Sequence, residues 1–558
     1  MPVRDEERGS DGRPDQRRWP VRSVPVALRE RYLAHGWWSD ETLGGLVDRC
    51  LRAASDATVH IWSEVRPWHG TFAELHAAAR RLVSALGAAG LEPGDVVAFQ
   101  LPNWREAVVA FYGLAMGGYV LVPIVHIYGP KEVRFILAES RARAYLSADR
   151  YGHVDYLDIV DGAGELPELD LHVVVGTAPP SANPQVRRVA WDEFESAAPA
   201  TAIGPAHPDD VCVLAYTSGT TSDPKGVMHT HRTLLAELVH MRSWVTPGSP
   251  NLMGSPVTHA TGMLGAVLTP MAMGEDIHLV DRWDPGRVLR IMVDAGVGAG
   301  TGASFFLASL LDHPEFTPEH ARHMGHVGLG GAPVPVALGE RAESLGITIV
   351  RAYGSTEHPS VTGCEFADPA DKRHGTDGSP MPGVDLRLLD DGGAPVAAEE
   401  VGEIWSRGPD LCVGYTNPEL TAEAFDEDGW YRSGDLGVLD ADGFLTITDR
   451  VKDVIIRGGE NISAAEIEEA ISPLPQVAEV AVVAAPDPRL GEHACAVVRL
   501  APDVASIELS EITDELDRIG IARQKWPEEL RVVGDFPRTA AGKIRKVDLR
   551  RQLRTDTP

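Results

Sequence analysis

The stretch 216–226 reads Tyr-Thr-Ser-Gly-Thr-Thr-Ser-Asp-Pro-Lys-Gly and is the part of the chain best suited to bind an anion. It follows an apolar run of strand length, 211–215, and its glycines let the backbone approach a ligand closely. Hydroxyl donors, backbone donors and one lysine charge can together hold the phosphates of a nucleotide. Taken alone, the stretch could also be an ordinary surface turn. The residues expected to contact phosphate are Thr217, Ser218, Gly219, Thr220, Thr221 and Lys225.

Five further clusters carry groups that suit the same chemistry. A glycine-rich turn at 328–333 could admit a flat ring, and 353–357 sets an aromatic residue beside a carboxylate. A second carboxylate lies in 431–435, which we expect to form a tight turn. Basic residues recur through 449–461, and 537–543 places a lysine in a turn near the C-terminus.

The elements that must position these clusters alternate between helices and short apolar strands. Thr71 and Glu74 have the spacing of a capping box and precede a helix with one apolar face. A helix at 105–116 and a strand at 119–123 follow. This alternation predicts an α/β fold in which helices cover parallel sheet on both faces.

The pattern of expected helices and strands changes twice after this region. Short strands and turns dominate 375–450, which predicts a small β-rich subdomain, and 451–558 has its own mixed order of helices and strands. We therefore expect a large N-terminal domain over 25–450 and a small mobile α+β domain after it. The charge-dense segment 1–24 is expected to be a disordered tail.

Composition excludes several classes of protein. The 558 residues include 51 basic and 81 acidic ones, a net charge of −30, which argues against binding nucleic acid or an anionic membrane surface. Five scattered cysteines without CxxC spacing predict neither disulfides nor a zinc site and fit a cytoplasmic protein. The apolar stretch 107–125 is interrupted by Gly117, Gly118 and Pro123, so no membrane span is expected. His229 and His231 could suggest a metal pair, but a structural role is the favoured interpretation.

In this order and at these separations, the clusters resemble those of the adenylate-forming superfamily, which includes acyl- and aryl-CoA ligases, peptide-synthetase adenylation domains and beetle luciferases. The resemblance extends from about Leu43 to the end of the chain. It implies a small C-terminal domain that swings between two orientations. It also implies that a carboxylic acid is joined to AMP with release of pyrophosphate and is then passed to a thiol. ATP, Mg²⁺ and coenzyme A are the implied small molecules.

The resemblance also assigns roles by position. Glu357 is the implied Mg²⁺ ligand, Thr356 a contact of the α-phosphate, and Lys543 the lysine that joins the attacking carboxylate to the nucleotide. Lys452 is the implied hinge of the small domain. The nucleoside contacts are assigned to Gly331, Ala332, Pro333, Tyr353, Gly354, Asp435 and Arg450, and the loop used in thioester formation to Arg457, Gly458, Gly459, Glu460 and Asn461.

The acid is expected to be a medium-sized apolar monocarboxylate, because the segments that should line its pocket are rich in apolar residues and lack a base. The sequence is most similar to the medium-chain or cyclohexanecarboxylate–CoA ligase branch of the superfamily. The residues expected in the acyl pocket are His259, Gly262, Met263, Ala303, Phe305, Gly330 and Ser355.

The acceptor thiol is expected to be coenzyme A, because 457–462 resembles the loop of stand-alone CoA ligases. Two other interpretations stay open: a stand-alone adenylation enzyme that loads a separate carrier protein, and a nucleotide-binding regulator without ligase chemistry. The phosphate loop departs from the family pattern at Ser222, where glycine is usual. A homodimer is possible on the sequence.

Overall fold

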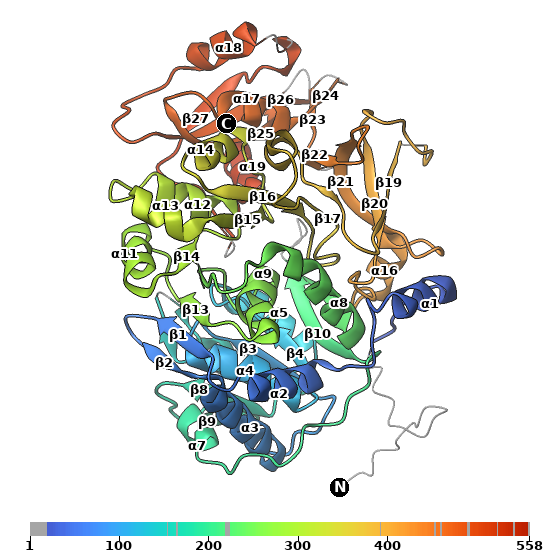
Figure 1. The fold of residues 1–558 in the computed structure, drawn as a ribbon, viewed down its shortest axis with the longest axis vertical. Helices are drawn as coiled ribbons and strands as arrows, with labels where there is room; N and C mark the ends of the chain where they lie inside the picture. Colours follow the sequence, from blue (N-terminus) through green and yellow to red (C-terminus); the bar gives the residue numbers. More distant parts are fainter. Residues whose placement is uncertain are drawn as a thin grey trace.

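The computed structural model describes most of the chain, in two domains of mixed helix and sheet (Figure 1). The C-terminal domain lies above the large domain in Figure 1, and a β-rich sheet lies at its right. The described residues are 19–555 without 153, 163–165, 218–223, 391, 451–452, 458–459, 488–490, 520, 522 and 540–541.

A seven-stranded sheet forms the base of the large domain, in the order β11-β10-β4-β3-β5-β8-β9. The neighbours from β10 to β9 run parallel, which confirms the predicted parallel sheet, while β10 and β11 form an antiparallel hairpin at one edge. Its strands are β3 (Val96–Gln100), β4 (Val120–Pro123), β5 (Ala144–Ala148), β8 (Leu171–Val175), β9 (Arg187–Ala190), β10 (Val211–Thr217) and β11 (Lys225–Thr230).

A second sheet of five strands, ordered β14-β12-β13-β1-β2, completes the lower part of the large domain. Helices that cover both sheets share one apolar core, and nearly every residue of helix α4 (Arg105–Met116) is buried in it. The strands are β1 (Thr58–Trp62), β2 (Trp68–Thr71), β12 (Asn251–Met253), β13 (Ile277–Val280) and β14 (Gly298–Ala299), and a short pair is formed by β6 (Arg150–Tyr151) and β7 (Val154–Asp155).

Two four-stranded sheets build the upper part of the large domain. In the first, β15 and β16 run parallel and deliver two of the predicted site segments to the same edge. The second is an antiparallel meander and corresponds to the predicted β-rich subdomain. The strands are β15 (His326–Gly330), β16 (Thr348–Tyr353), β17 (Thr362–Gly363) and β18 (Ser379–Pro380), then β19 (Asp385–Leu389), β20 (Gly402–Arg407), β21 (Tyr431–Leu439) and β22 (Leu445–Arg450).

The C-terminal domain has a five-stranded sheet with its own apolar core. Its longest pair, β25 and β26, is antiparallel, and the helices α17 and α19 pack against β25. The strands are β23 (Ile455–Arg457), β24 (Glu460–Ile462), β25 (Val477–Asp487), β26 (Gly491–Leu500) and β27 (Glu529–Val532).

The helices begin where the sequence supplies caps. The side chain of Thr71 accepts a hydrogen bond from the Glu74 amide, and the carboxylate of Glu74 accepts one from the Thr71 amide. The predicted capping box is therefore present at α3. The α-helices are α1 (Val26–Ala34), α2 (Leu43–Ala53), α3 (Phe72–Ala88), α4 (Arg105–Met116), α5 (Pro130–Glu139), α6 (Leu157–Asp161), α7 (Trp191–Glu195), α8 (His231–Met241), α9 (Ala260–Gly262), α10 (Thr269–Met273), α11 (Pro285–Ala295), α12 (Ser304–Leu311), α13 (Pro318–Met324), α14 (Val336–Ser344), α15 (Ala370–Gly375), α16 (Pro418–Ala424), α17 (Ala464–Ile471), α18 (Leu509–Arg518) and α19 (Lys546–Thr555). Short 3₁₀ turns lie at Arg242–Trp244 and Arg523–Lys525, and a π-helical turn at Met263–Leu268.

The predicted disordered tail extends too far, because residues 19–24 are part of the packed structure. Trp19 is only 8% exposed, and the guanidinium of Arg22 donates to the carbonyl of Cys412 at 2.9 and 3.1 Å. Arg22 also lies over the ring of Phe425. The high charge of the segment concealed the two side chains that attach it to the large domain. Residues 1–18 lie outside the described part of the chain.

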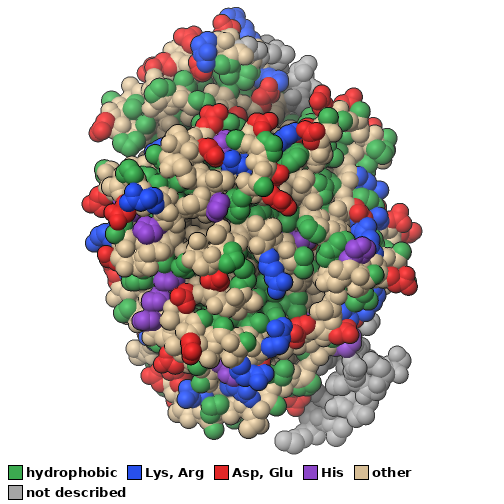
Figure 2. Space-filling view, viewed as in Figure 1, with side chains coloured by type: hydrophobic (Ala, Val, Ile, Leu, Met, Phe, Trp, Pro, Cys, Tyr) green, Lys and Arg blue, Asp and Glu red, His purple; other side chains and the backbone are tan. Residues whose placement is uncertain are grey.

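Three observations concern the helices, the thiols and the surface. Among the described residues, no helix combines the length and apolar character that a bilayer span needs. All five cysteines are buried free thiols. On the face shown in Figure 2, acidic and basic side chains are interspersed without a broad basic patch.

Candidate active site

A cavity of about 750 Å³ lies where the β15–β16 edge, the β-rich sheet and the C-terminal domain meet. Parallel strands bring the residues that follow them to a common edge, which is where ligands bind in open α/β sheets. Most of the predicted nucleotide-binding residues with described side chains line this one space. They are Thr217, Lys225, Gly331, Tyr353, Gly354, Thr356, Glu357, Asp435 and Lys543, with His259, Gly330 and Ser355 from the predicted acyl pocket.

Asp435 and Tyr353 form a direct link across the cavity. The Tyr353 hydroxyl donates to Oδ2 of Asp435 at 2.7 Å, and burial together with this carboxylate raises the pKa of the tyrosine well above its usual range. The expected tight turn around Asp435 is wrong, because the residue lies within strand β21. Gly434 has a φ of 72°, so it bends the strand locally without ending it.

Glu357 presents its carboxylate to the same cavity. Its Oε1 accepts a hydrogen bond from the hydroxyl of Tyr415 at 2.8 Å, and Lys225 lies over the Tyr415 ring at 5.5 Å. Carboxylate and hydroxyl oxygens, here from Glu357, Thr356 and Thr217, are the donors that Mg²⁺ prefers. The residues present therefore fit a magnesium ion bound together with phosphates.

His229 and His231 each form a hydrogen bond with the backbone of another segment, in agreement with a structural role. Nε2 of His229 donates to the carbonyl of Thr356 at 2.8 Å, and burial lowers the pKa of this histidine, so it stays neutral. Nδ1 of His231 accepts the amide of Leu43 at 2.9 Å. His229 thus fixes the backbone next to Glu357.

Lys543 reaches the cavity from a tight turn of the C-terminal domain. The amide of Thr539 donates to the Lys543 carbonyl at 2.7 Å, the Lys543 amide donates to Thr539 Oγ1 at 3.1 Å, and Gly542 has a φ of 82°. The small domain is therefore in an orientation that brings this lysine to the wall shared with Glu357 and Asp435.

Several predicted acyl-pocket and nucleoside residues are not part of the described lining. The π-helical turn that begins at Met263 buries this side chain in the core and presents Leu264, Gly265 and Ala266 to the cavity. Phe305 instead packs against the C-terminal domain, where the guanidinium of Arg538 lies 4.9 Å from its ring. Gly262, Met263, Ala303, Phe305, Ala332 and Pro333 are not among the described residues that line this cavity, and their roles stay predictions.

Gly262 has a packing role that the sequence could not reveal. A Cβ at this position would lie 2.0 Å from the carbonyl oxygen of Pro256, so glycine allows the backbones to approach closely. His259 does line the cavity, and its Nδ1 accepts the amide of Thr261 at 3.3 Å. Burial lowers the pKa of His259 to about 4, so at neutral pH it offers no positive charge to a second carboxylate of the substrate.

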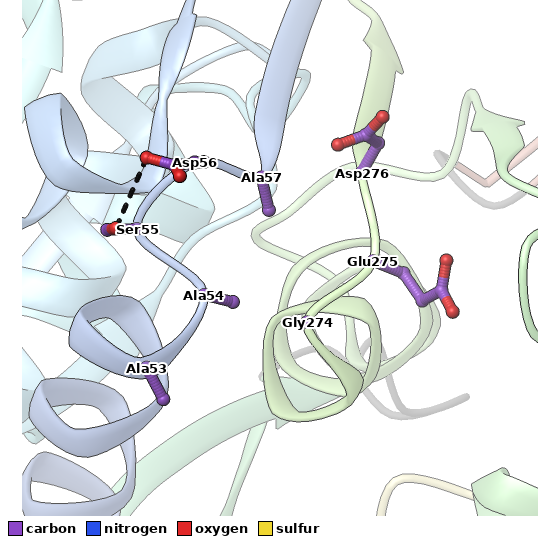
Figure 3. A pocket seen from close by; sticks show the side chains of 8 residues that line it. All are labelled: Ala53, Ala54, Ser55, Asp56, Ala57, Gly274, Glu275 and Asp276. Atoms are coloured by element: carbon purple, nitrogen blue, oxygen red, sulfur yellow. Dashed lines mark hydrogen bonds between the residues drawn. The ribbon is translucent and has the colours of Figure 1, made fainter.

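Sequence reasoning missed much of the lining, because it lies on elements without a recognisable motif. Examples are Trp244, Asn251, Glu275, Asp276, His278 and Tyr415. Glu275 and Asp276 also border a neighbouring cavity of about 440 Å³, whose other wall is the end of α2 and the turn after it (Figure 3). Of these residues, only Tyr415 could have been suspected from the sequence. Residues 413–416 pair with the backbone of β11, the strand that follows the phosphate loop.

Some predictions fall outside what the structure describes. Ser218, Gly219, Thr220 and Thr221, the hinge Lys452, and Gly458 and Gly459 lie in undescribed stretches, as does Ser222. Arg450 lies opposite Asp435 in the β21–β22 register, and Glu460 and Asn461 belong to β24. Arg457 pairs with Glu528 of its own domain at 2.5 Å, so it does not enter the cavity in this orientation.

Comparison with known proteins decides the family. The family model described as AMP-binding enzyme matches residues 47–416, and its C-terminal domain model matches residues 466–543. The chain belongs to the AMP-binding enzyme family. It is 33% identical to a medium-chain fatty-acid–CoA ligase of Escherichia coli, over 94% of this chain and 93% of that protein.

One further relative and one solved structure are similar to most of the chain. A feruloyl-CoA synthase of an Amycolatopsis species is 33% identical over 87% of this chain and 94% of its own. The ATP-bound structure of MatB from Rhodopseudomonas palustris superposes with a TM-score of 0.79 at 26% identity and covers 92% of this chain and 99% of that one. This AMP-binding enzyme is an acid–thiol ligase that uses ATP, Mg²⁺ and coenzyme A. It forms an acyl adenylate with release of pyrophosphate and then the CoA thioester with release of AMP.

A substitution at Gly354 tests the loop that carries Glu357, because the backbone of Gly354 lies close to that of Pro359. A Cβ there would lie 1.9 Å from the carbonyl oxygen of Pro359. Gly354→Ala should therefore lower the free energy of unfolding by about 1–3 kcal/mol and weaken ATP binding. Gly87→Ala, in an exposed part of α3 with nothing within 4 Å, is the control and should leave both unchanged or raise stability slightly. Urea unfolding and ATP titration measure the pair, and equal behaviour of the two variants would contradict the proposed crowding.

Proposed function

We propose that the cavity shared by Glu357, Asp435 and Lys543 carries out the adenylation half-reaction on a medium-sized apolar monocarboxylate. The observation that carries the proposal is that a lysine from the C-terminal domain lines the same space as carboxylates from two sheets of the large domain. A carboxylate and a triphosphate repel one another, so a cation between them lowers the barrier to their reaction.

The residues act on separate parts of the nucleotide. Asp435, held by Tyr353, accepts hydrogen bonds from the ribose hydroxyls, and the glycine-rich edge at Gly330 and Gly331 leaves space for the adenine ring. Lys225 and Thr217 hold the terminal phosphates. Glu357 would hold Mg²⁺, which when bound neutralises phosphate charge.

The chemical steps follow from these positions. A carboxylate oxygen of the acid attacks the α-phosphorus, and the bond to the bridging oxygen breaks so that pyrophosphate leaves. Lys543 contacts both the attacking oxygen and the nucleotide, and its charge opposes the negative charge that builds up in the transition state. The thiolate of coenzyme A then attacks the acyl carbon and AMP leaves.

The second step uses another orientation of the small domain. Rotation about Lys452 withdraws Lys543 and turns Arg457, Gly458, Gly459, Glu460 and Asn461 toward the cavity. Such domain rotations occur on the order of microseconds to milliseconds.

A cytoplasmic location and a homodimer are further expectations for the protein. Light scattering tests the homodimer.

The acid class is tested by a panel with AMP release as the readout. Octanoate, cyclohexanecarboxylate and benzoate should be activated, because the lining near Leu264 and Met253 is apolar and His259 is neutral at pH 7. Glutarate and adipate should be poor substrates, since a second carboxylate would find no cation there. Preference for the dicarboxylates would overturn the assignment of the acid while leaving the ligase chemistry intact.

A further inference from the structure

A buried cluster of acidic and histidine side chains lies at the wall of the active-site cavity, and one of its members, Glu237, lines that cavity. Glu237 and His240 lie three residues apart on α8, and Asp410 lies in the chain after β20. Their relative exposures are 1%, 0% and 0%. One ligand atom from each residue lies within 4.8 Å of the others. The substrate chemistry described above uses none of the three.

The hydrogen bonds of His240 fix which of its nitrogens could bind a ligand. Nε2 lies 2.9 Å from the carbonyl oxygen of Pro382, which can only accept, so this nitrogen carries a proton. Nδ1 is buried and has no hydrogen-bond partner among the described residues, and it faces Oε2 of Glu237 at 3.6 Å and Oδ1 of Asp410 at 3.9 Å. A lone pair aimed at two carboxylates is unfavourable unless positive charge lies between them.

Hydrogen bonds from neighbouring residues also fix the orientation of the two carboxylates. Oε1 of Glu237 accepts a hydrogen bond from the hydroxyl of Ser360 at 2.6 Å, while its Oε2 is buried and finds no hydrogen-bond partner in the described part of the chain. Oδ2 of Asp410 accepts the amide of Ser360 at 3.1 Å, and Nε2 of His358 lies 3.1 Å from its Oδ1. The outer groups thus orient all three side chains, as is usual around metal ligands.

We propose that Glu237, His240 and Asp410 form a site for a divalent first-row transition metal such as Zn²⁺, separate from the magnesium site at Glu357. Ligand atoms about 2.0–2.1 Å from a tetrahedral zinc ion lie roughly 3.4 Å apart. The separations of 3.6 and 3.9 Å are close to that value, and both exceed a hydrogen bond. Two carboxylates and a neutral imidazole carry two negative charges, which a divalent ion balances.

The two carboxylates place negative charge close to Nδ1 of His240, so charge balance as well as distance favours a cation between the three side chains. A bound cation would join α8 to the segment that carries Asp410, next to Ser360 in the cavity wall, and so would stabilise the packing of α8 against the segment that follows β20.

The test is direct metal binding to the full chain, purified without a polyhistidine tag and freed of metal with a chelator. We expect one Zn²⁺ per chain by titration calorimetry and elemental analysis, with a rise in melting temperature on addition of Zn²⁺. Asp410→Asn and Glu237→Gln should weaken binding on the order of 100-fold. Failure of the wild type to bind Zn²⁺, or equal affinity in Asp410→Asn, overturns the proposal.

Two control variants separate this site from other binding. Glu343→Gln removes a carboxylate that lies 3.4 Å from His374 outside the cluster, and it should bind Zn²⁺ like the wild type. Glu357→Gln should also keep Zn²⁺ binding, because the magnesium site is separate. Loss of binding in either control contradicts the assignment.

If the cluster variants fail to fold, the zinc environment of the wild type decides. X-ray absorption at the zinc edge should show one imidazole nitrogen with oxygen ligands. Sulfur or a second imidazole in the first coordination sphere excludes this cluster. An imidazolium without metal is the remaining state of the site, and it corresponds to a wild type that binds no Zn²⁺.

Discussion

Replacement of Lys543 by alanine should reduce acyl-adenylate formation by about 10²–10³, equivalent to roughly 3–4 kcal/mol of transition-state stabilisation. The reason is that the lysine reaches the cavity from the turn closed by Thr539 and Gly542 and supplies charge between two anions. Thioester formation from supplied acyl-AMP should remain near the wild-type rate, because that step uses the other orientation of the small domain. Acid-dependent pyrophosphate exchange and single-turnover thiolation measure the two halves separately.

The matched control is Lys525→Ala. Lys525 belongs to the same small domain and pairs with Glu466 at 2.6 Å, outside the cavity lining. Its removal should leave both half-reactions unchanged, since exposed ion pairs contribute little. An equal loss of both half-reactions in Lys543→Ala would count against a lysine that acts in one orientation only.

Replacement of Glu357 by glutamine should raise the Mg²⁺ concentration needed for half-maximal adenylation on the order of 100-fold. An amide oxygen is a weaker ligand than a carboxylate for a hard cation. Mg²⁺ titration of pyrophosphate exchange, at saturating ATP and acid, measures the shift.

Tyr415→Phe provides a graded comparison for this prediction. It removes only the hydroxyl that donates to Oε1 of Glu357 at 2.8 Å, so its Mg²⁺ dependence should shift by at most about tenfold. An unchanged Mg²⁺ dependence in Glu357→Gln, with lower activity at every concentration, would assign Glu357 to another role.

Much of the fold could be predicted because its helices and strands carry local signals. The capping box at Thr71 and the apolar helix 105–116 both lie where the sequence indicated. The change to short strands after residue 375 also corresponds to the meander β19–β22. Hydrophobic periodicity and caps act over a few residues, so a single sequence contains them.

Among the described residues, more of those predicted to bind the nucleotide than of those predicted to bind the acid line the cavity. Motif residues such as Tyr353 and Asp435 follow or lie on strands that carry them to one cavity. The acyl lining depends on features without a local signature: the π-helical turn at Met263 changes which side chains face inward, and Phe305 is taken up by contact with Arg538. The metal-ligating set on α8 and after β20 is a tertiary arrangement in the same sense.

The β10–β11 hairpin has a consequence for how this enzyme could vary. Thr217 and Lys225 are paired partners at the loop end of that hairpin, and the donor-rich stretch runs from one to the other. Because the two ends are fixed by strand pairing, the stretch between them can change in composition with little displacement of its anchors. A change of sequence between these anchors therefore leaves the backbone position of Lys225 set by its pairing with Thr217.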